Sequence, residues 1–225
     1  MADGSYHHGN LRAALLERAE HVLVASGAEG LSLRALARDL GVSHAAPARH
    51  FRDRQALLDA LAVNGFTRLN GRLRAAAAAP GPVPARLEAL GRAYVDFAVA
   101  HAPLLELMFT VKHSDGSSAE LRELGHHSLE IAAELIAEGQ LQGVVRAEDP
   151  GRLAQVAFSA LHGLAMLAVA SLLEDTPLSE ATDLTLDVLL RGLGAATGDP
   201  LRNPRLDCGS LESGHRTEEA KRGEQ

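Results

Sequence analysis

The stretch from residue 31 to residue 54 constrains the fold most, because two short helical patterns meet there at a glycine. Ser32 is the predicted N-cap of the first pattern. Its apolar side chains recur at the spacing of one helix face: Leu33, Leu36, Ala37 and Leu40. Gly41 supplies the left-handed conformation that ends a helix, and Ser43 then caps a second predicted helix that runs to about Phe51. This helix-turn-helix layout places its second helix in the major groove of DNA.

The second predicted helix carries small, polar and basic side chains. These are His44, Ala45, Ala46, Pro47, Ala48 and Arg49. Such a surface suits close approach to base edges and phosphates, and only Phe51 has the character of a core anchor. A solvated helix of an all-α domain would show the same composition and is the alternative. Pro47 lacks the N–H that would bond to the Ser43 carbonyl, which disturbs the helix unless it begins one residue later.

The composition favours helices over sheets. Aromatic residues make up 3% of the chain and tryptophan is absent, whereas alanine and leucine dominate. Cap signals and apolar periodicity predict helices over residues 11–26, 33–40, 43–51, 54–79, 84–101, 103–109, 119–141, 150–173 and 179–193. We therefore expect an all-α fold of about nine helices.

The net charge of −7 is unevenly distributed along the chain. Residues 1–55 carry seven arginines and six acidic residues, whereas the remainder carries 15 basic and 23 acidic residues. The basic residues of the motif lie on its second helix and directly after it, where phosphate contacts are expected. Any contact with nucleic acid should therefore be local to this region.

The sequence indicates neither catalysis nor a cofactor. No glycine-rich phosphate loop, HExxH string or GxSxG string occurs, so we expect no enzyme activity. The histidines of the second half could converge on a metal, but their spacings fit no standard zinc pattern, and we expect no metal. They are His101, His113, His126, His127 and His162.

The sequence also indicates neither export nor membrane insertion. Cys208 is the only cysteine, which excludes an intrachain disulfide. The N-terminus has no signal-peptide pattern, and the longest apolar run, residues 164–173, is too short to cross a bilayer. We therefore expect a cytoplasmic protein without a membrane partner.

Two parts of the chain resemble the TetR family of transcriptional regulators. The first is the segment GVSHAAPARHF followed by DRQALLDAL, with YHHGNLRAALLERAEHVLVASGAEGLSLRALA upstream. The second is His162-Gly163, which resembles the branch of the family whose C-terminal domain carries a Trp-His-Gly signature, although Leu161 stands at the tryptophan position. Ala48 stands where the family usually has a tyrosine that reaches the DNA, so His44 and Arg49 would have to compensate.

The resemblance implies a helix-turn-helix domain at residues 1–52 and a helical ligand-binding and dimerisation domain at residues 53–198. Residues 199–225, poor in apolar side chains, are expected to be a disordered tail. The candidate DNA-binding residues are Ser32, Arg34, Ser43, His44, Ala45, Pro47, Ala48, Arg49, His50 and Arg54.

The candidate ligand-binding residues are apolar side chains and histidines of the second domain. They are Phe66, Leu69, Phe97, His101, Met108, Phe109, His127 and His162. A pocket of this composition indicates a small hydrophobic effector, and plain core packing of the same residues is the alternative.

The helix at 150–173 is apolar nearly all round and needs partners on more than one face. The economical solution pairs it and the helix at 179–193 with their copies in a second subunit, and an extra-buried helix within one chain is the alternative. Two DNA half-sites favour the homodimer.

We therefore expect a ligand-responsive regulator, in the repressor role, that binds a palindromic operator in double-stranded DNA. One alternative is a helical small-molecule-binding or catalytic protein that has weakened or lost DNA binding, which Ala48 favours. Another is a protein–protein interaction module that docks through the helix at 150–173.

Overall fold

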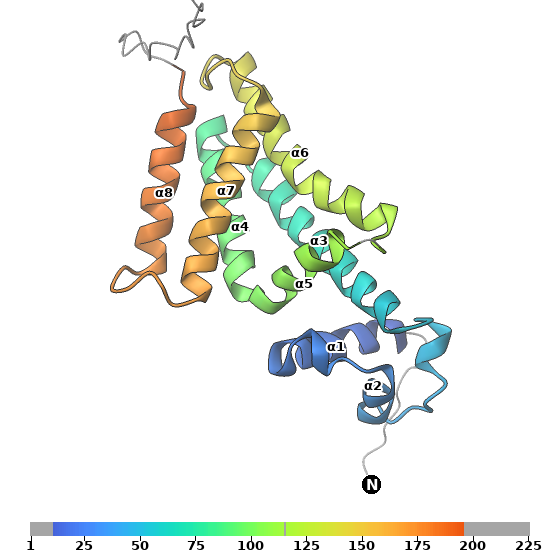
Figure 1. The fold of residues 1–225 in the computed structure, drawn as a ribbon. Coiled ribbons are helices and arrows are strands. Elements are labelled where there is room, and N and C mark those ends of the chain that lie inside the picture. Colours follow the sequence, from blue (N-terminus) through green and yellow to red (C-terminus); the bar gives the residue numbers. More distant parts are fainter. Residues whose placement is uncertain (1–10, 115, 196–225) are drawn as a thin grey trace, which may run out of the picture. The chain divides into compact units, whose positions relative to one another are not determined.

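The computed structural model describes residues 11–114 and 116–195, and these residues form helices without strands (Figure 1). The eight α-helices are α1 Leu11–Ser26, α2 Leu33–Asp39, α3 Arg54–Ala77, α4 Val83–Ala100, α5 Ala102–Lys112, α6 Ala119–Leu141, α7 Pro150–Val169 and α8 Leu178–Leu193. Two 3₁₀ helices, η1 Ala28–Gly30 and η2 Pro47–Arg49, lie in the N-terminal part. The predicted all-α fold is confirmed. Cys208 and the predicted tail at 199–225 lie outside the described residues.

Side-chain caps fix where several helices begin. The side chains of Asp53, Ser118 and Asp149 accept hydrogen bonds from backbone amides three residues further on, over 2.8, 3.1 and 2.8 Å. Each bond satisfies one of the amides that a first helical turn leaves unpaired. Asp53 is thereby the N-cap of α3, and Asp149, followed by Pro150, is the N-cap of α7.

Two helix ends differ from the prediction by three residues or more. The predicted short helix at 103–109 is longer, since α5 continues to Lys112. The predicted helix at 150–173 is shorter, since α7 ends at Val169 and Ser171 adopts a left-handed conformation with φ 57°. The amide of Leu172 then closes the helix end on the carbonyl of Leu167 at 2.8 Å.

The second helix of the motif does not form as an α-helix, and this prediction was wrong. Its place is taken by turns followed by η2, so eight α-helices are present among the described residues instead of about nine. Pro47 has no N–H for the carbonyl of Ser43, which accepts instead from Ala46 at 2.9 Å. The amides of Arg49 and His50 likewise bond three residues back. This shorter repeat is that of a 3₁₀ helix.

Helix α3 is central to the packing, because it contacts α1, α4, α5 and α6. The large apolar side chains along one face of α3 are buried: Leu57, Leu58, Leu61, Phe66, Leu69 and Leu73. Close approach of α5 needs a glycine in α3. A Cβ placed at Gly65 would lie 2.4 Å from the sulfur of Met108.

The C-terminal helices pack as a second group, in which α7 contacts α4, α6 and α8, and α8 contacts α4 (Figure 1). Taken singly, α7 is the one described helix that is long and apolar enough to cross a membrane. Its contacts with three other helices account for its inner face, which buries Leu153, Leu161 and Leu164.

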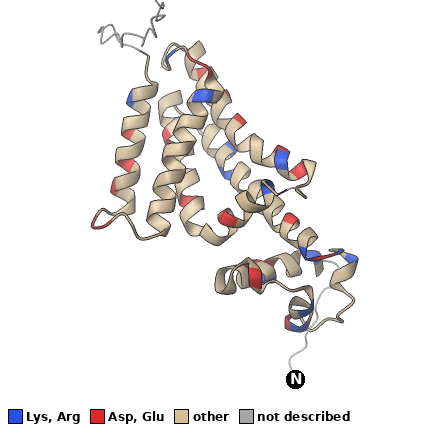
Figure 2. Ribbon diagram, in the orientation of Figure 1, with Lys and Arg blue, Asp and Glu red and all other residues tan. Residues whose placement is uncertain are grey.

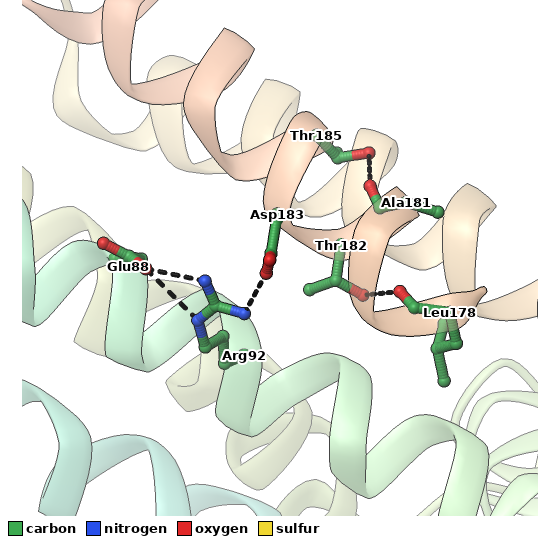
Figure 3. A network of polar contacts seen from close by, with 7 residues as sticks. All are labelled: Glu88, Arg92, Leu178, Ala181, Thr182, Asp183 and Thr185. Carbon is green, nitrogen blue, oxygen red and sulfur yellow. Dashed lines mark hydrogen bonds and ion pairs between the residues drawn. The ribbon is translucent and has the colours of Figure 1, made fainter. Parts of the chain in front are cut away.

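A polar network fixes α8 against α4 (Figure 3). Arg92 of α4 donates to Glu88 one turn earlier, over 2.7 and 3.2 Å, and to Asp183 of α8. The hydrogen bonds that Arg92 donates to these two carboxylates raise its pKa. Because the three side chains are largely exposed, the network sets the position of α8 more than it adds to stability.

Candidate functional site

The helix-turn-helix segment is built on a small core shared by α1, α2, η2 and the start of α3. Its buried side chains are Leu15, Leu16, Ala19, Leu23, Leu31, Leu36, Ala37, Pro47, Phe51, Leu57 and Leu58. Gly41 ends α2 with φ 66°, as predicted, and the amides of Gly41 and Val42 bond back to Arg38 and Ala37 at 3.1 and 3.0 Å. This paired arrangement directs the chain from α2 into the segment that precedes η2.

Nine of the ten candidate DNA-binding residues are exposed, and Pro47 is buried. The proline ring belongs to the core, so it is not available to a base edge. His44, Ala48, Arg49 and His50 form an exposed set around η2. The small, polar and basic side chains predicted for a recognition helix are therefore exposed, but they lie on turns and on the single 3₁₀ turn η2.

Two arginines hold the segment together. Arg54, a candidate DNA-binding residue, donates to the carbonyls of Ala28 and Leu31 over 2.6 and 3.2 Å. Arg18 of α1 donates to Asp39 at the end of α2, at 2.8 Å. Arg54 thus ties α3 to η1 and keeps only its remaining N–H groups for a phosphate.

Basic residues lie along α2 and around the start of α3 (Figure 2). Arg34 and Arg38 project from α2, and Arg49, Arg52 and Arg54 follow in and after η2, all of them exposed. Asp39 and Asp53 lie among them, paired with Arg18 and Arg52. The positive charge is local, as the division of charge along the sequence predicted.

A second candidate site is a cavity of about 250 Å³ between α3, α4, α5, α6 and α7. Its apolar wall consists of Phe66, Leu69, Phe109, Leu129 and Phe158. Its polar wall consists of Tyr94, Lys112, His113, Ser128, Gln155 and His162, with Gly125 between them. A smaller, mostly apolar cavity of about 50 Å³ shares Tyr94, Ser128, Leu129 and Phe158 with it.

The cavity gathers aromatic rings in a chain that has few. Of five phenylalanines and two tyrosines, Phe66, Tyr94, Phe109 and Phe158 line it. Phe158 stacks on the ring of His162, with centroids 5.3 Å apart and planes at 20°, and the centroid of Phe109 is also 5.3 Å from that of His162. Packed rings with a few polar tips are typical of small-molecule pockets.

Tyr94 and His162 share a hydrogen bond at the cavity wall, with 2.7 Å between the tyrosine hydroxyl and Nδ1 of the histidine. Burial lowers the pKa of His162 and raises that of Tyr94. Both groups are therefore neutral near pH 7. They offer a polar but uncharged contact to anything in the cavity.

Four of the eight candidate ligand-binding residues line this cavity, namely Phe66, Leu69, Phe109 and His162. The other four lie elsewhere. Phe97 and Met108 are core residues, with Phe97 packed against the ring of His101 at 4.8 Å and Met108 packed against Gly65. His101 lies near the pair formed by Arg68 and Glu20.

His127 lies in an open groove of about 410 Å³ between α3, α4 and α6, where it contacts Arg74 and, at 3.0 Å, Glu130. The rim of this groove also carries Arg86 and Glu138, paired at 2.6 Å. The guanidinium lowers the pKa of Glu138. The internal pairing of these charges leaves the groove without a strong preference for a charged ligand.

Sequence reasoning missed Tyr94, Phe158 and Lys112 as lining residues. Phe158 precedes His162 by one helical turn and so shares its face, a signal that was available. Lys112 lies beyond the predicted helix at 103–109, whereas α5 extends to it. The spacing of apolar residues around Tyr94 is the same for a side chain in the core and for one that lines a cavity.

The chain matches two family models. A model described as the C-terminal domain of tetracyclin repressor-like proteins matches residues 87–193, and a model described as bacterial regulatory proteins of the tetR family matches residues 15–61. No curated protein matches the chain.

Several solved structures share the fold. A protein with unknown function from Rhodococcus sp. RHA1 is 47% identical, with a TM-score of 0.80 over 85% of this chain and 100% of that one. A regulatory protein of the tetR family from Rhodococcus RHA1 is 19% identical, with a TM-score of 0.65 over 82% and 97% of the two chains.

A third structure, the transcriptional regulator FadR from Bacillus subtilis in complex with stearoyl-CoA, is 15% identical, with a TM-score of 0.66 over 81% and 99%. At such identities the second and third structures show the fold alone. Matches to both halves of the chain, together with this fold, establish that it belongs to the TetR family of transcriptional regulators.

Proposed function

We propose that the chain is a ligand-responsive repressor that binds a palindromic operator as a homodimer in the cytoplasm and is released by a small hydrophobic effector. In this proposal, residues 1–52 bind DNA, residues 53–198 bind the ligand and dimerise, and no reaction is catalysed. The observation that carries it is the course of α3. This helix begins at Arg54, within the helix-turn-helix segment, and reaches the cavity with Phe66 and Leu69.

A second link between the two sites supports coupling. Arg68 of α3 donates through Nη1 to both carboxylate oxygens of Glu20 in α1, over 2.7 and 2.9 Å. The Nη2 atom of Arg68 lies 3.3 Å from Nε2 of His101, the residue between α4 and α5. A ligand that shifts α3 or α5 would therefore also shift α1, because α1 contacts both.

The exposed face of α7 and α8 supports the homodimer. Val156 and Leu167 of α7 are exposed, and the exposed small residues Ala160 and Gly163 lie between them on the same face. Leu184, Val188 and other apolar side chains of this region are also exposed. Exposed apolar side chains on two helices that contact each other fit a four-helix interface between two copies.

The mechanism follows from spacing. Two reading heads dock on one face of DNA only when their half-sites lie roughly 34–36 Å apart. A ligand that binds more tightly to a dimer with another separation shifts the population away from DNA.

The test is selection of bound genomic fragments by the purified full-length protein, followed by footprinting at two salt concentrations. We expect a two-fold-symmetric footprint whose affinity falls at least roughly tenfold between 50 and 200 mM salt. Arg49→Ala should weaken binding to all sequences and His44→Ala should change sequence preference, whereas Arg146→Ala, an exposed arginine far along the chain, serves as control. No enriched fragment would count against the proposal.

A second candidate function, a small-molecule-binding protein with weakened DNA binding, is favoured by η2. Pro47 is buried and Ala48 offers no ring to a phosphate or a thymine methyl. Ala48→Tyr should then raise DNA affinity above that of the wild type. If Ala48→Tyr and the wild type bind DNA with equal affinity, the repressor function is favoured.

A further inference from the structure

The chain is acidic overall, but the wall of the 250 Å³ cavity carries only basic charged side chains. The chain has 29 acidic residues against 22 basic ones, yet the cavity is lined by one lysine and two histidines and by no carboxylate. The three basic residues of this wall are Lys112, His113 and His162. Burial lowers the pKa of His162, which disfavours its charged form, whereas Lys112 brings an ammonium group to the site.

Lys112 reaches the cavity across α6 at Gly125. A Cβ at Gly125 would lie 2.6 Å from Cδ, 2.7 Å from Cε and 2.9 Å from Nζ of Lys112, so any larger residue would displace the lysine. The ammonium lies 6.0 Å from the ring centroid of Phe66, which is a cation–π distance. The glycine and the ring together hold the charge beside the aromatic wall.

The charge of Lys112 is not neutralised within the described part of the chain. None of the described carboxylates lies within 4.0 Å of its ammonium, and burial lowers its pKa. A cation at the C-terminal end of α5 is favoured by the helix dipole, which explains a lysine at this position but not its place beside the rings. An anion in the cavity would restore the electrostatic stabilisation that burial removes.

From this geometry we propose that the cavity binds a small carboxylic acid, with its carboxylate on the ammonium of Lys112 and its apolar body against Phe66, Phe109 and Phe158. This inference rests on the proposed function, since it names the chemical class of the effector. The volume of about 250 Å³ lies below the range of roughly 300–1,000 Å³ usual for ligand pockets, which limits the acid to a small one.

The experiment compares acids with their neutral amides of the same shape, phenylacetate with phenylacetamide and octanoate with octanamide. Binding to the full-length wild-type protein is measured by calorimetry at pH 7. We expect at least one acid to bind roughly tenfold or more tightly than its amide, because a charge-assisted contact is present only in the acid.

Three variants assign the preference to its residue. Lys112→Met keeps the length and apolar stem of the side chain and should reduce the acid-to-amide ratio to below roughly twofold, while Lys112→Arg should retain a preference. The matched control is Lys221→Met, which removes the only other lysine of the chain and should leave the ratio unchanged. The comparison of acid with amide on the wild type stands even if a variant fails to fold.

Equal binding of acid and amide, binding of neither member in both pairs, or a preference that survives in Lys112→Met would each overturn the inference. Its failure is distinguishable from failure of the proposed function. If the protein binds an operator but shows no preference for acids, the repressor function is supported and the inference about the ligand fails. If acid binding depends on Lys112 but no operator is bound, the ligand site is supported and the repressor function fails.

Discussion

At the scale of single residues, glycines decide how closely helices approach. Gly65 lets α5 lie against α3, with Met108 filling the space that a Cβ would take. Gly125 of α6 likewise leaves room for the side chain of Lys112, which comes from α5. Alanine at the two positions would act differently, because the atom in the way is the buried sulfur of Met108 at the first and the far end of a lysine at the second.

We predict that Gly65→Ala lowers the free energy of unfolding by about 1–3 kcal/mol, the usual effect of overpacking a core. Gly71→Ala, on the same helix, is the matched control, since nothing lies within 4 Å of its Cβ position. It should raise stability by about 0.5–1 kcal/mol through helix propensity. Urea titration of both variants measures the difference, and equal midpoints would show that α3 and α5 are not in close contact.

A second residue-scale prediction concerns pH. Burial lowers the pKa of His162 from its ordinary value of 6.5, so the unfolded chain takes up this proton at a higher pH than the folded protein does. Stability should therefore fall as the pH drops below about 6.5, and His162→Gln should flatten the fall. His101, whose pKa is lowered by burial and by Arg68, acts in the same direction and leaves part of the slope. Urea midpoints between pH 5 and 8 report it, and identical profiles of variant and wild type would contradict it.

At the scale of elements, local signals decide where helices begin, and Asp149 at the start of α7 is an example. Its side chain accepts from the amide of Arg152 at 2.8 Å and is followed by Pro150. We predict that Asp149→Ala lowers the free energy of unfolding by about 1 kcal/mol, because one amide of the first turn loses its partner. Glu148→Ala, an exposed neighbour, should change it by less than about 0.5 kcal/mol. Thermal or urea denaturation compares the two variants, and equal effects would dismiss Asp149 as a cap.

The segment around η2 shows a local signal that works against an element. Spacing predicts a helix from Ser43, but the missing N–H of Pro47 removes its first full turn. Pro47 also fills a place in the small core beside Phe51, which a surface helix would not provide. The surface presented to DNA therefore depends on the packing of the proline as much as on exposed side chains.

At the scale of the whole molecule, the apolar side chains left exposed on α7 and α8 indicate assembly. We predict that Val188→Asp, which places a charge on the exposed face of α8, converts a dimer into monomers in sedimentation velocity, because a buried, unpaired carboxylate costs several kcal/mol. Val24→Asp is the control, since Val24 is equally exposed on α1. An unchanged dimer in the first variant would place the interface elsewhere.

The sequence by itself determined the helical class, most helix limits and the inward stripes. These features depend on interactions within a few residues: caps such as Asp53 and Asp149, the left-handed turn at Gly41, and apolar side chains three and four apart. Even the failure of the second motif helix has its cause in one residue, Pro47, although periodicity alone favoured a helix.

Only the tertiary structure decided which side chains form the cavity. Phe66, Tyr94, Phe109 and Phe158 come from four helices, and each stripe taken alone looks the same whether it faces a core or a hollow. Likewise, the sequence could not show that Lys112 crosses α6 at Gly125 while His127 lies in an outer groove. The angles and distances between packed helices decide this, and they arise from contacts far apart in the chain.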